Sequence, residues 1–347
     1  MGALRIFLYG GYRNRTPLAY APIRQALGDR IILTDSPSGA QLVVISHFRD
    51  FELFGTEIAS MLATWPRLRL VLLSEEPYWD SCWTPDPFTR QQWVQTDAGR
   101  VIVTLLNHET SHIYRGAHIP YFLLTDTSYL ARYRASFARN AGRSATDWYH
   151  HFRQTRHDAV FLMARRTSAS LAPDFGNDAL LGLSVWRSQM AERCVEASRQ
   201  GRVICEGQGW SQTPPRQDLS DWHADKFARF DLSTRYMAAF ENTHQRDYIS
   251  EKIWDAFALG AIPLYLAGSD HALHRLIRAN GWINFHSSLP QVPAFDATQP
   301  VSLAMAEDYA AQQVHLARCF CDMDRVCAEY ERFSDALVAE LSSICAA

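Results

Sequence analysis

The sequence has no long hydrophobic run and no large excess of charge of either sign. Its longest apolar stretch, residues 256–268, contains Pro263 and is well short of the roughly 20 residues that span a bilayer, so we expect no transmembrane segment. The formal net charge is −3, and the basic residues are scattered, which gives no electrostatic reason for a nucleic-acid partner. A peripheral contact with a membrane surface stays open.

Cysteines are also few for a chain of this length. Seven cysteines in 347 residues are too dispersed for a secreted disulfide framework, and they indicate reduced thiols. Cys319, Cys321 and Cys327 form the one cluster, but it lies in a helical pattern without a CxxC pair, so we expect buried thiols and no zinc site. The N-terminal apolar run is too short for the core of a signal peptide. We therefore expect a cytoplasmic protein.

What the sequence does contain is an alternation of strand and helix patterns. The chain is long enough for two hydrophobic cores. Short β-rich runs alternate with helical spacing in residues 4–106, and the pattern starts again at residue 158, which predicts α/β domains of the doubly wound type. We expect domains over residues 1–155 and 156–302, followed by a helical tail over residues 303–347. Ligands of such sheets bind beyond the carboxyl ends of the strands.

The stretch FENTHQRDYISEKIWDAFALGAIPLYLAG, residues 240–268, carries the strongest chemical signal. It reads as the end of a strand, a polar loop, a helix over residues 249–259 and a further strand over residues 261–266. Ser250 is the expected N-cap, with Glu251 and Lys252 in the first helical turn. A cation there opposes the helix dipole. An anion such as a diphosphate would explain Lys252, and a solvated lysine on an exposed helix face is the alternative.

This stretch resembles the signature of the α-1,3-fucosyltransferases, glycosyltransferase family 10. Their pattern is F-E-N-S/T, four residues, Y-V/I-T/S-E-K, a helix and a V/I-P-I/V segment, and it fits residues 240–252 without a gap. The resemblance implies an α/β GT-B fold with two Rossmann-like domains and a cleft between them. It also implies inverting transfer of fucose from GDP-fucose to a glycan hydroxyl, without a required metal. A divalent ion would then act only as a stimulant, by screening phosphate charge.

The resemblance assigns roles to individual residues of the second domain. By position, Glu251 contacts the ribose or sugar of the donor and Lys252 its diphosphate. Upstream, Arg187 lies where the family has a donor-binding arginine, and VICEGQGW (203–210) resembles the loop that follows. Where the family often has a Y-K-F triplet, this chain has Arg235, Tyr236 and Met237, which weakens the inference that the donor is GDP-fucose. The complete set of expected donor-binding residues is Arg187, Glu241, Asn242, Tyr248, Glu251 and Lys252.

The first domain should supply the base that deprotonates the acceptor. VLLSEEPYW (71–79) brings two acids to the end of a strand and resembles the family segment with the proposed base, so Glu75 is the candidate. A shift of one residue would select Glu76, and neighbouring side chains on an extended edge point in opposite directions. HIPYF (118–122) resembles a short family segment at the end of this domain.

Trp79 and Trp83 follow the proposed base, and they are candidates for an acceptor-binding platform because aromatic faces stack on sugar rings. A packed core is the alternative for these two rings. Asp322 and Asp324 form the only Asp-x-Asp pair, and on one helix they would point about 200° apart and could not chelate one ion. We therefore expect no metal site.

Two further functions stay open. The same machinery could use another nucleotide sugar in lipopolysaccharide core assembly, or the chain could be a non-catalytic nucleotide- or carbohydrate-binding protein. The preferred acceptor is a bacterial surface glycan built at the inner face of the inner membrane. A Golgi enzyme of this family would carry an N-terminal anchor and paired cysteines.

Overall fold

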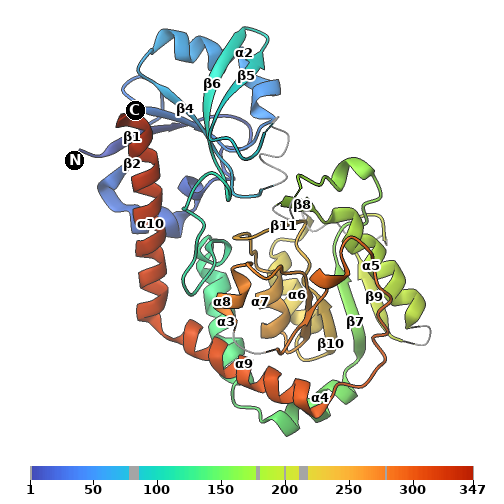
Figure 1. Cartoon of the computed structure of the whole chain (residues 1–347). Helices are drawn as coiled ribbons and strands as arrows, with labels where there is room; N and C mark the ends of the chain where they lie inside the picture. Colours follow the sequence, from blue (N-terminus) through green and yellow to red (C-terminus); the bar gives the residue numbers. More distant parts are fainter. Residues whose placement is uncertain are drawn as a thin grey trace. The chain divides into compact units, whose positions relative to one another are not determined.

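The computed structural model describes residues 2–77, 86–176, 180–198, 201–210, 218–277 and 280–346. The chain divides into two compact units (Figure 1). Unit 1 contains Met1–Thr127 and Val326–Ala347, and unit 2 contains Ser128–Arg325. Among the helices of the described ranges, none combines the length and the apolar character needed to cross a membrane.

Unit 1 is built on a six-stranded sheet with the order β2-β1-β3-β4-β6-β5. All neighbouring strands are parallel except β5, which pairs antiparallel with β6. The strands are β1 (Leu4–Leu8), β2 (Ile31–Leu33), β3 (Leu42–Ile45), β4 (Arg69–Leu73), β5 (Gln91–Thr96) and β6 (Gly99–Leu106).

The central strands of this sheet are apolar because both of their faces are covered. Every residue of β3 is buried, as is typical of a parallel strand with helices on both sides. Val43, Ile45 and Leu72 pack in one core with Ile58 of the second helix. The helices of unit 1 are η1 (Pro17–Ala19), α1 (Ala21–Leu27), η2 (Gly28–Arg30), α2 (Asp50–Thr64), η3 (Tyr121–Leu124) and most of α10 (Met323–Ala346).

Unit 2 is built on a five-stranded sheet with the order β13-β12-β10-β7-β9, all parallel. A separate antiparallel pair joins β8 and β11. The strands are β7 (His157–Leu162), β8 (Leu180–Gly182), β9 (Val203–Glu206), β10 (Thr234–Ala238), β11 (Thr243–Gln245), β12 (Ile262–Tyr265) and β13 (Ile283–Asn284). The helices are α3 (Thr127–Asn140), α4 (Ala145–Gln154), η4 (Ala169–Leu171), α5 (Ser184–Ala197), α6 (Trp222–Phe230), α7 (Lys252–Ala258), α8 (Leu273–Leu276), η6 (His286–Ser288) and α9 (Leu303–Cys321).

Both units therefore have the same topology. When the parallel strands are numbered along the chain within each unit, their order is 2-1-3-4-5 in both sheets. This is a doubly wound Rossmann-like arrangement, and it confirms the predicted α/β class with two such domains. Its switch point lies between β1 and β3 in unit 1 and between β7 and β10 in unit 2, where an open sheet binds ligands.

The division of the chain differs from the one expected at residues 155 and 302. Helices α3 and α4 precede residue 155, yet both belong to unit 2 apart from Thr127, and α4 packs against α9. The helical tail is shared, because α9 lies in unit 2 and α10 from Val326 onward lies in unit 1. The segment 129–155 has no strand pattern, but it contains a capping box in which Ser144 and Asp147 bond each other's backbone N–H. That signal marks the start of α4.

Candidate active site

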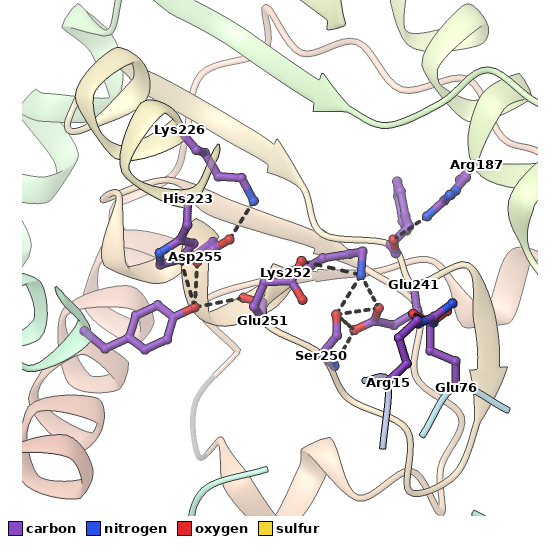
Figure 2. A network of polar contacts seen from close by, with 12 residues as sticks. Arg15, Glu76, Arg187, His223, Lys226, Glu241, Ser250, Glu251, Lys252 and Asp255 are labelled. Atoms are coloured by element: carbon purple, nitrogen blue, oxygen red, sulfur yellow. Dashed lines mark hydrogen bonds and ion pairs between the residues drawn. The ribbon is translucent and has the colours of Figure 1, made fainter. Parts of the chain in front are cut away.

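The expected donor-binding segment leaves the sheet of unit 2 at its switch point. Strand β10 ends at Ala238, and Glu241 follows it at the carboxyl edge beside β7. The chain then forms β11, turns through residues 246–251 and enters α7 at Lys252. Arg187 reaches the same edge from the first turn of α5 (Figure 2). The topology thus gathers these residues from three segments of the unit.

Glu241 is the centre of a compact polar group. Its carboxylate is buried, with 3% of the residue exposed. The backbone N–H of Ser250 donates to Oε1 at 2.8 Å, and the Ser250 hydroxyl lies 2.8 Å from Oε1 and 2.7 Å from Oε2. Nζ of Lys252 donates to Oε2 at 2.8 Å. A buried carboxylate requires such partners, since an unpaired charge would be strongly destabilising.

Lys252 is held by more than one group but stays accessible. Its Nζ donates to the Ser250 hydroxyl at 2.7 Å and lies 3.8 Å from Oε1 of Glu251, and 26% of its side chain is exposed. Burial alone would lower the pKa of Lys252, but the carboxylates of Glu241 and Glu251 outweigh it and raise that pKa. The amine is therefore a fixed positive charge that a ligand can reach.

Arg187 adds a second positive charge near Lys252. Its residue is 8% exposed, and Nη1 donates to the Phe240 carbonyl at 3.4 Å, just before Glu241. The guanidinium is close enough to repel the Lys252 ammonium, and this repulsion offsets a small part of the rise in the pKa of that amine. Figure 2 shows Arg187 and Lys252 on either side of the chain at Glu241. Two cations at the ligand-binding edge of a parallel sheet can bind an anion such as a diphosphate.

The start of α7 differs from the expectation in one respect. Ser250 is not the N-cap, because the N-cap is Glu251 and its side chain makes no capping hydrogen bond. The Ser250 hydroxyl is instead directed to Glu241, and the helix begins at Lys252, three residues after the expected start at residue 249. A buried carboxylate competes successfully with the helix for this hydroxyl.

The remaining two expected donor residues are part of the framework around this group. The carbonyl of Asn242 accepts the backbone N–H of Leu183 at 2.8 Å and so ties the β10–β11 segment to the start of α5. Tyr248 is only 2% exposed, and its backbone N–H donates to Gln245. Both residues lie in the expected loop, and their role toward a donor stays a prediction.

A second polar group lies one helical turn beyond Lys252, and no local motif in the sequence predicts it. Asp255 is fully buried, and its Oδ1 accepts the Tyr133 hydroxyl at 2.6 Å and lies 2.6 Å from Nε2 of His223. Lys226 donates to Oδ2 at 2.6 Å. Figure 2 shows the group beside Glu251. It joins α3, α6 and α7, and Lys226 and Lys252 are the only two lysines in the sequence.

Unit 1 places Glu75 in a separate buried site after β4. The residue is 3% exposed, and each carboxylate oxygen accepts a tyrosine hydroxyl. Tyr20 donates to Oε1 at 2.9 Å, and Tyr121, from the HIPYF segment, donates to Oε2 at 2.7 Å. Burial raises the pKa of Glu75, and the two tyrosine hydrogen bonds offset only part of that rise. The carboxylate is thus a stronger base than an exposed glutamate.

Glu76 has a different environment. Its Oε1 lies 3.0 Å from Nη2 of Arg15, and 23% of its side chain is exposed. The two adjacent acids therefore separate into a buried one and a paired, partly exposed one, in the bend that follows β4. Trp79 and Trp83, the candidate acceptor residues, lie outside the described residues.

The described ranges contain no group of three or more His, Cys, Asp or Glu side chains arranged to hold a metal ion. The geometry assumed for Asp322 and Asp324 was wrong, because α9 ends at Cys321 and the two residues do not share one helix. Asp322 accepts the backbone N–H of Asp324 and Arg325 at the start of α10. Arg235, in the position that departs from the family triplet, is buried and bonds Asp158 and the Phe152 carbonyl.

Comparison with known proteins bears on the same segment of unit 2. The model of the family described as glycosyltransferase family 10 (fucosyltransferase), C-terminal, matches residues 203–289. No curated protein shows significant similarity to the chain. Three solved structures of α1,3-fucosyltransferase, free, with GDP and with GDP-fucose, are 12%, 13% and 13% identical to it.

The alignments with these structures cover nearly the whole chain, but the structural similarity is low. They cover 100%, 100% and 99% of this chain and 91%, 91% and 90% of their own, with TM-scores of 0.46, 0.42 and 0.43. Scores this low support no inference about the ligand of this chain. The family match does not depend on them, and it includes Glu241, Glu251 and Lys252. Of the group around Asp255 it includes Asp255, His223 and Lys226 but not Tyr133. Residues 203–289 of this chain thus match glycosyltransferase family 10, the fucosyltransferase family.

Proposed function

We propose that the chain transfers fucose from GDP-fucose to a hydroxyl of a glycan, with inversion at the anomeric carbon. The observation that supports this most is the pair of cations, Arg187 and Lys252, at the switch point of a parallel sheet inside or beside the family segment. A diphosphate placed there would receive charge-assisted hydrogen bonds, which are stronger than neutral ones.

In this proposal the donor leaves as GDP. The bond from the anomeric carbon to the β-phosphate oxygen breaks, and its electron pair stays on the phosphate. Arg187 and Lys252 stabilise the charge that grows on the phosphate during this step. Glu241 and Ser250 hold the Lys252 amine in place, so little reorganisation is needed when the donor reacts.

The acceptor must lose a proton as its oxygen attacks the anomeric carbon. Glu75 is the proposed base, since burial makes its carboxylate more basic than that of an exposed glutamate. Glu76 is the less suitable candidate, because its carboxylate is already paired with Arg15 at 3.0 Å. The proposal for the acceptor is a surface glycan or lipopolysaccharide built in the bacterial cytoplasm at the inner membrane. The donor could be identified before the acceptor is known.

The test is a donor comparison with purified protein. Thermal shift and saturation-transfer NMR are measured with GDP-fucose, GDP-mannose, GDP, UDP-galactose and UDP-N-acetylglucosamine. Selective stabilisation by GDP and GDP-fucose is the expected result. Stabilisation by a UDP-sugar instead would show that the machinery uses another donor. Binding of GDP-fucose without any release of GDP, over a panel of glycan acceptors, would favour a non-catalytic protein.

A further inference from the structure

The Glu75 carboxylate is too enclosed to meet an acceptor directly. Only 3% of the residue is exposed, and both oxygens already accept a hydrogen bond from a tyrosine. A sugar hydroxyl has to lie within about 3 Å of the atom that takes its proton. A base buried in this way needs either a movement of its partners or an intermediate group.

The two tyrosines that enclose Glu75 are not equivalent. Tyr121 is 2% exposed, and it packs between Tyr114, Phe122 and Phe333 in the interior of unit 1. Tyr20 lies between η1 and α1, and its side chain is partly exposed. Of the two hydroxyls bonded to Glu75, that of Tyr20 therefore belongs to the residue that solvent or a ligand can reach.

We propose that Tyr20 relays the acceptor proton to Glu75. This inference rests on the proposed function, with Glu75 as the base. The Tyr20 hydroxyl donates to Oε1 of Glu75 at 2.9 Å, and a phenolic oxygen that donates its proton can also accept one. The sugar hydroxyl would bond to the Tyr20 oxygen, on the side away from the carboxylate.

The proposed step moves two protons and exchanges one bond at the anomeric carbon. The acceptor O–H bond breaks and its proton moves to the Tyr20 oxygen, while the proton of Tyr20 moves to Oε1 of Glu75. The acceptor oxygen forms its bond to the anomeric carbon as the bond to the β-phosphate breaks. The products are the glycoside, GDP and a neutral Glu75, which returns its proton to solvent through Tyr20. Tyr121 keeps its hydrogen bond to Oε2 and positions the carboxylate throughout.

Tyr121 provides a matched control for Tyr20. Both hydrogen bonds lower the pKa of Glu75, so Tyr20→Phe and Tyr121→Phe should raise that pKa in the same direction. If the tyrosines only tune the base, each variant shifts the acid limb of the pH profile and recovers its rate at higher pH. If Tyr20 is in the proton path, its removal lowers kcat at every pH.

The experiment measures GDP release from GDP-fucose with N-acetyllactosamine and, separately, with water as acceptor. Tyr20→Phe is expected to lose roughly 100-fold or more in kcat across the pH range, with unchanged GDP affinity and little change in Tm. Tyr121→Phe should lose less than about tenfold near its pH optimum. Similar losses in the two variants, or recovery of Tyr20→Phe at high pH, would overturn the relay.

Two further measurements separate the relay from the proposed function. Glu75→Gln should lower kcat by roughly 10²–10⁴; if it keeps full activity, the base itself is wrong and the relay falls with it. If Glu75→Gln is inactive and Tyr20→Phe is active, only the relay fails. In the unmodified protein, a plot of kcat against the fraction of D2O should bow below a straight line, because two protons move in the step. A straight line, which a single moving proton gives, contradicts the relay. A protein that binds GDP-fucose but releases no GDP over the whole panel of glycan acceptors contradicts the proposed function.

Discussion

The pairing of Lys252 with Glu241 predicts that replacing this lysine affects both stability and ligand binding. Lys252→Met keeps most of the aliphatic stem and removes the ammonium that bonds Glu241 at 2.8 Å and Ser250 at 2.7 Å. The Glu241 carboxylate then stays buried and keeps its hydrogen bonds with Ser250, but it loses the positive charge of Lys252. From sequence position alone, a lysine at a solvated edge would be replaced without loss of stability.

The expected loss follows from the burial of the two partners. Removal of one member of a buried ion pair costs about 3–5 kcal/mol. Lys252 is 26% exposed, so water can partly replace its amine, and we expect a decrease of about 1–3 kcal/mol in the free energy of unfolding. For a unit of this size that corresponds to a decrease of about 3–10 °C in Tm. GDP affinity should fall roughly ten- to a hundredfold if the amine also binds the diphosphate.

A set of four proteins separates the two roles of Lys252. Calorimetric scans and GDP titrations at 10 °C are made with the unmodified chain, Lys252→Met, the double variant Glu241→Gln/Lys252→Met, and Lys226→Met. The double variant removes both charges, so its Tm should return toward that of the unmodified chain while GDP binding stays weak. Lys226→Met, which leaves Asp255 without its lysine, should lower Tm and leave GDP affinity unchanged.

The effects of Lys252→Met on stability and on GDP binding are tested separately. An unchanged Tm in Lys252→Met would show that the buried carboxylate does not depend on the amine. A lower Tm with unchanged GDP affinity would show that Lys252 is a counter-ion of Glu241 and not a ligand of the donor.

Four further predictions concern the other charged groups. Glu75→Gln should lower kcat by roughly 10²–10⁴ with unchanged GDP affinity, whereas Glu76→Gln should have a mild effect; steady-state kinetics with GDP titrations compare them, and a reversed order would make Glu76 the base. Because burial raises the pKa of Glu75, kcat should fall with decreasing pH around a midpoint above 4.5, and a midpoint at or below 4.5 contradicts that environment. Arg187→Ala should weaken GDP binding by about ten- to a hundredfold, while Arg193→Ala, an exposed change on the same helix, should have no effect in the same titration. Burial alone would raise the pKa of Asp255, but Lys226 and His223 lower it. The stabilisation from the Asp255 carboxylate is therefore fully present above the unfolded pKa of about 3.9 and is lost as the pH falls through the lower folded pKa. Asp255→Asn should lower Tm at pH 7 and reduce the loss of Tm on acidification, as measured by unfolding at a series of pH values.

The parts of the fold that sequence could predict depend on local patterns. Helix α6 forms over Trp222–Phe230, where Asp221 is a typical N-cap residue and accepts the backbone N–H of Ala224. Strand β5 gives only a weak strand signal, since its residues QQWVQT are mostly polar. Their burial alternates along the strand, and the turn before Gly99, which has a positive φ, was the signal of a hairpin.

The residues of the candidate site also differ in how far apart they lie in the sequence. The residues near Lys252 follow one another in the chain, so a motif could identify them. Glu75 meets Tyr20 and Tyr121 across 55 and 46 residues, and Asp255 meets Tyr133 across 122. No local spacing records such pairings, because they form only when each unit folds and brings distant segments together. The unequal burial of Glu75 and Glu76 arises in the same way.

The scarcity of lysine gives this protein an unusual spectroscopic simplicity. Reductive methylation with ¹³C-formaldehyde would label only Lys226, Lys252 and the terminal amine, since the sequence has no other lysine. Each labelled side chain belongs to a different buried carboxylate group, around Asp255 and Glu241 respectively. A carbon–proton correlation spectrum would thus contain two side-chain signals, and titration with a nucleotide would show directly which group senses it.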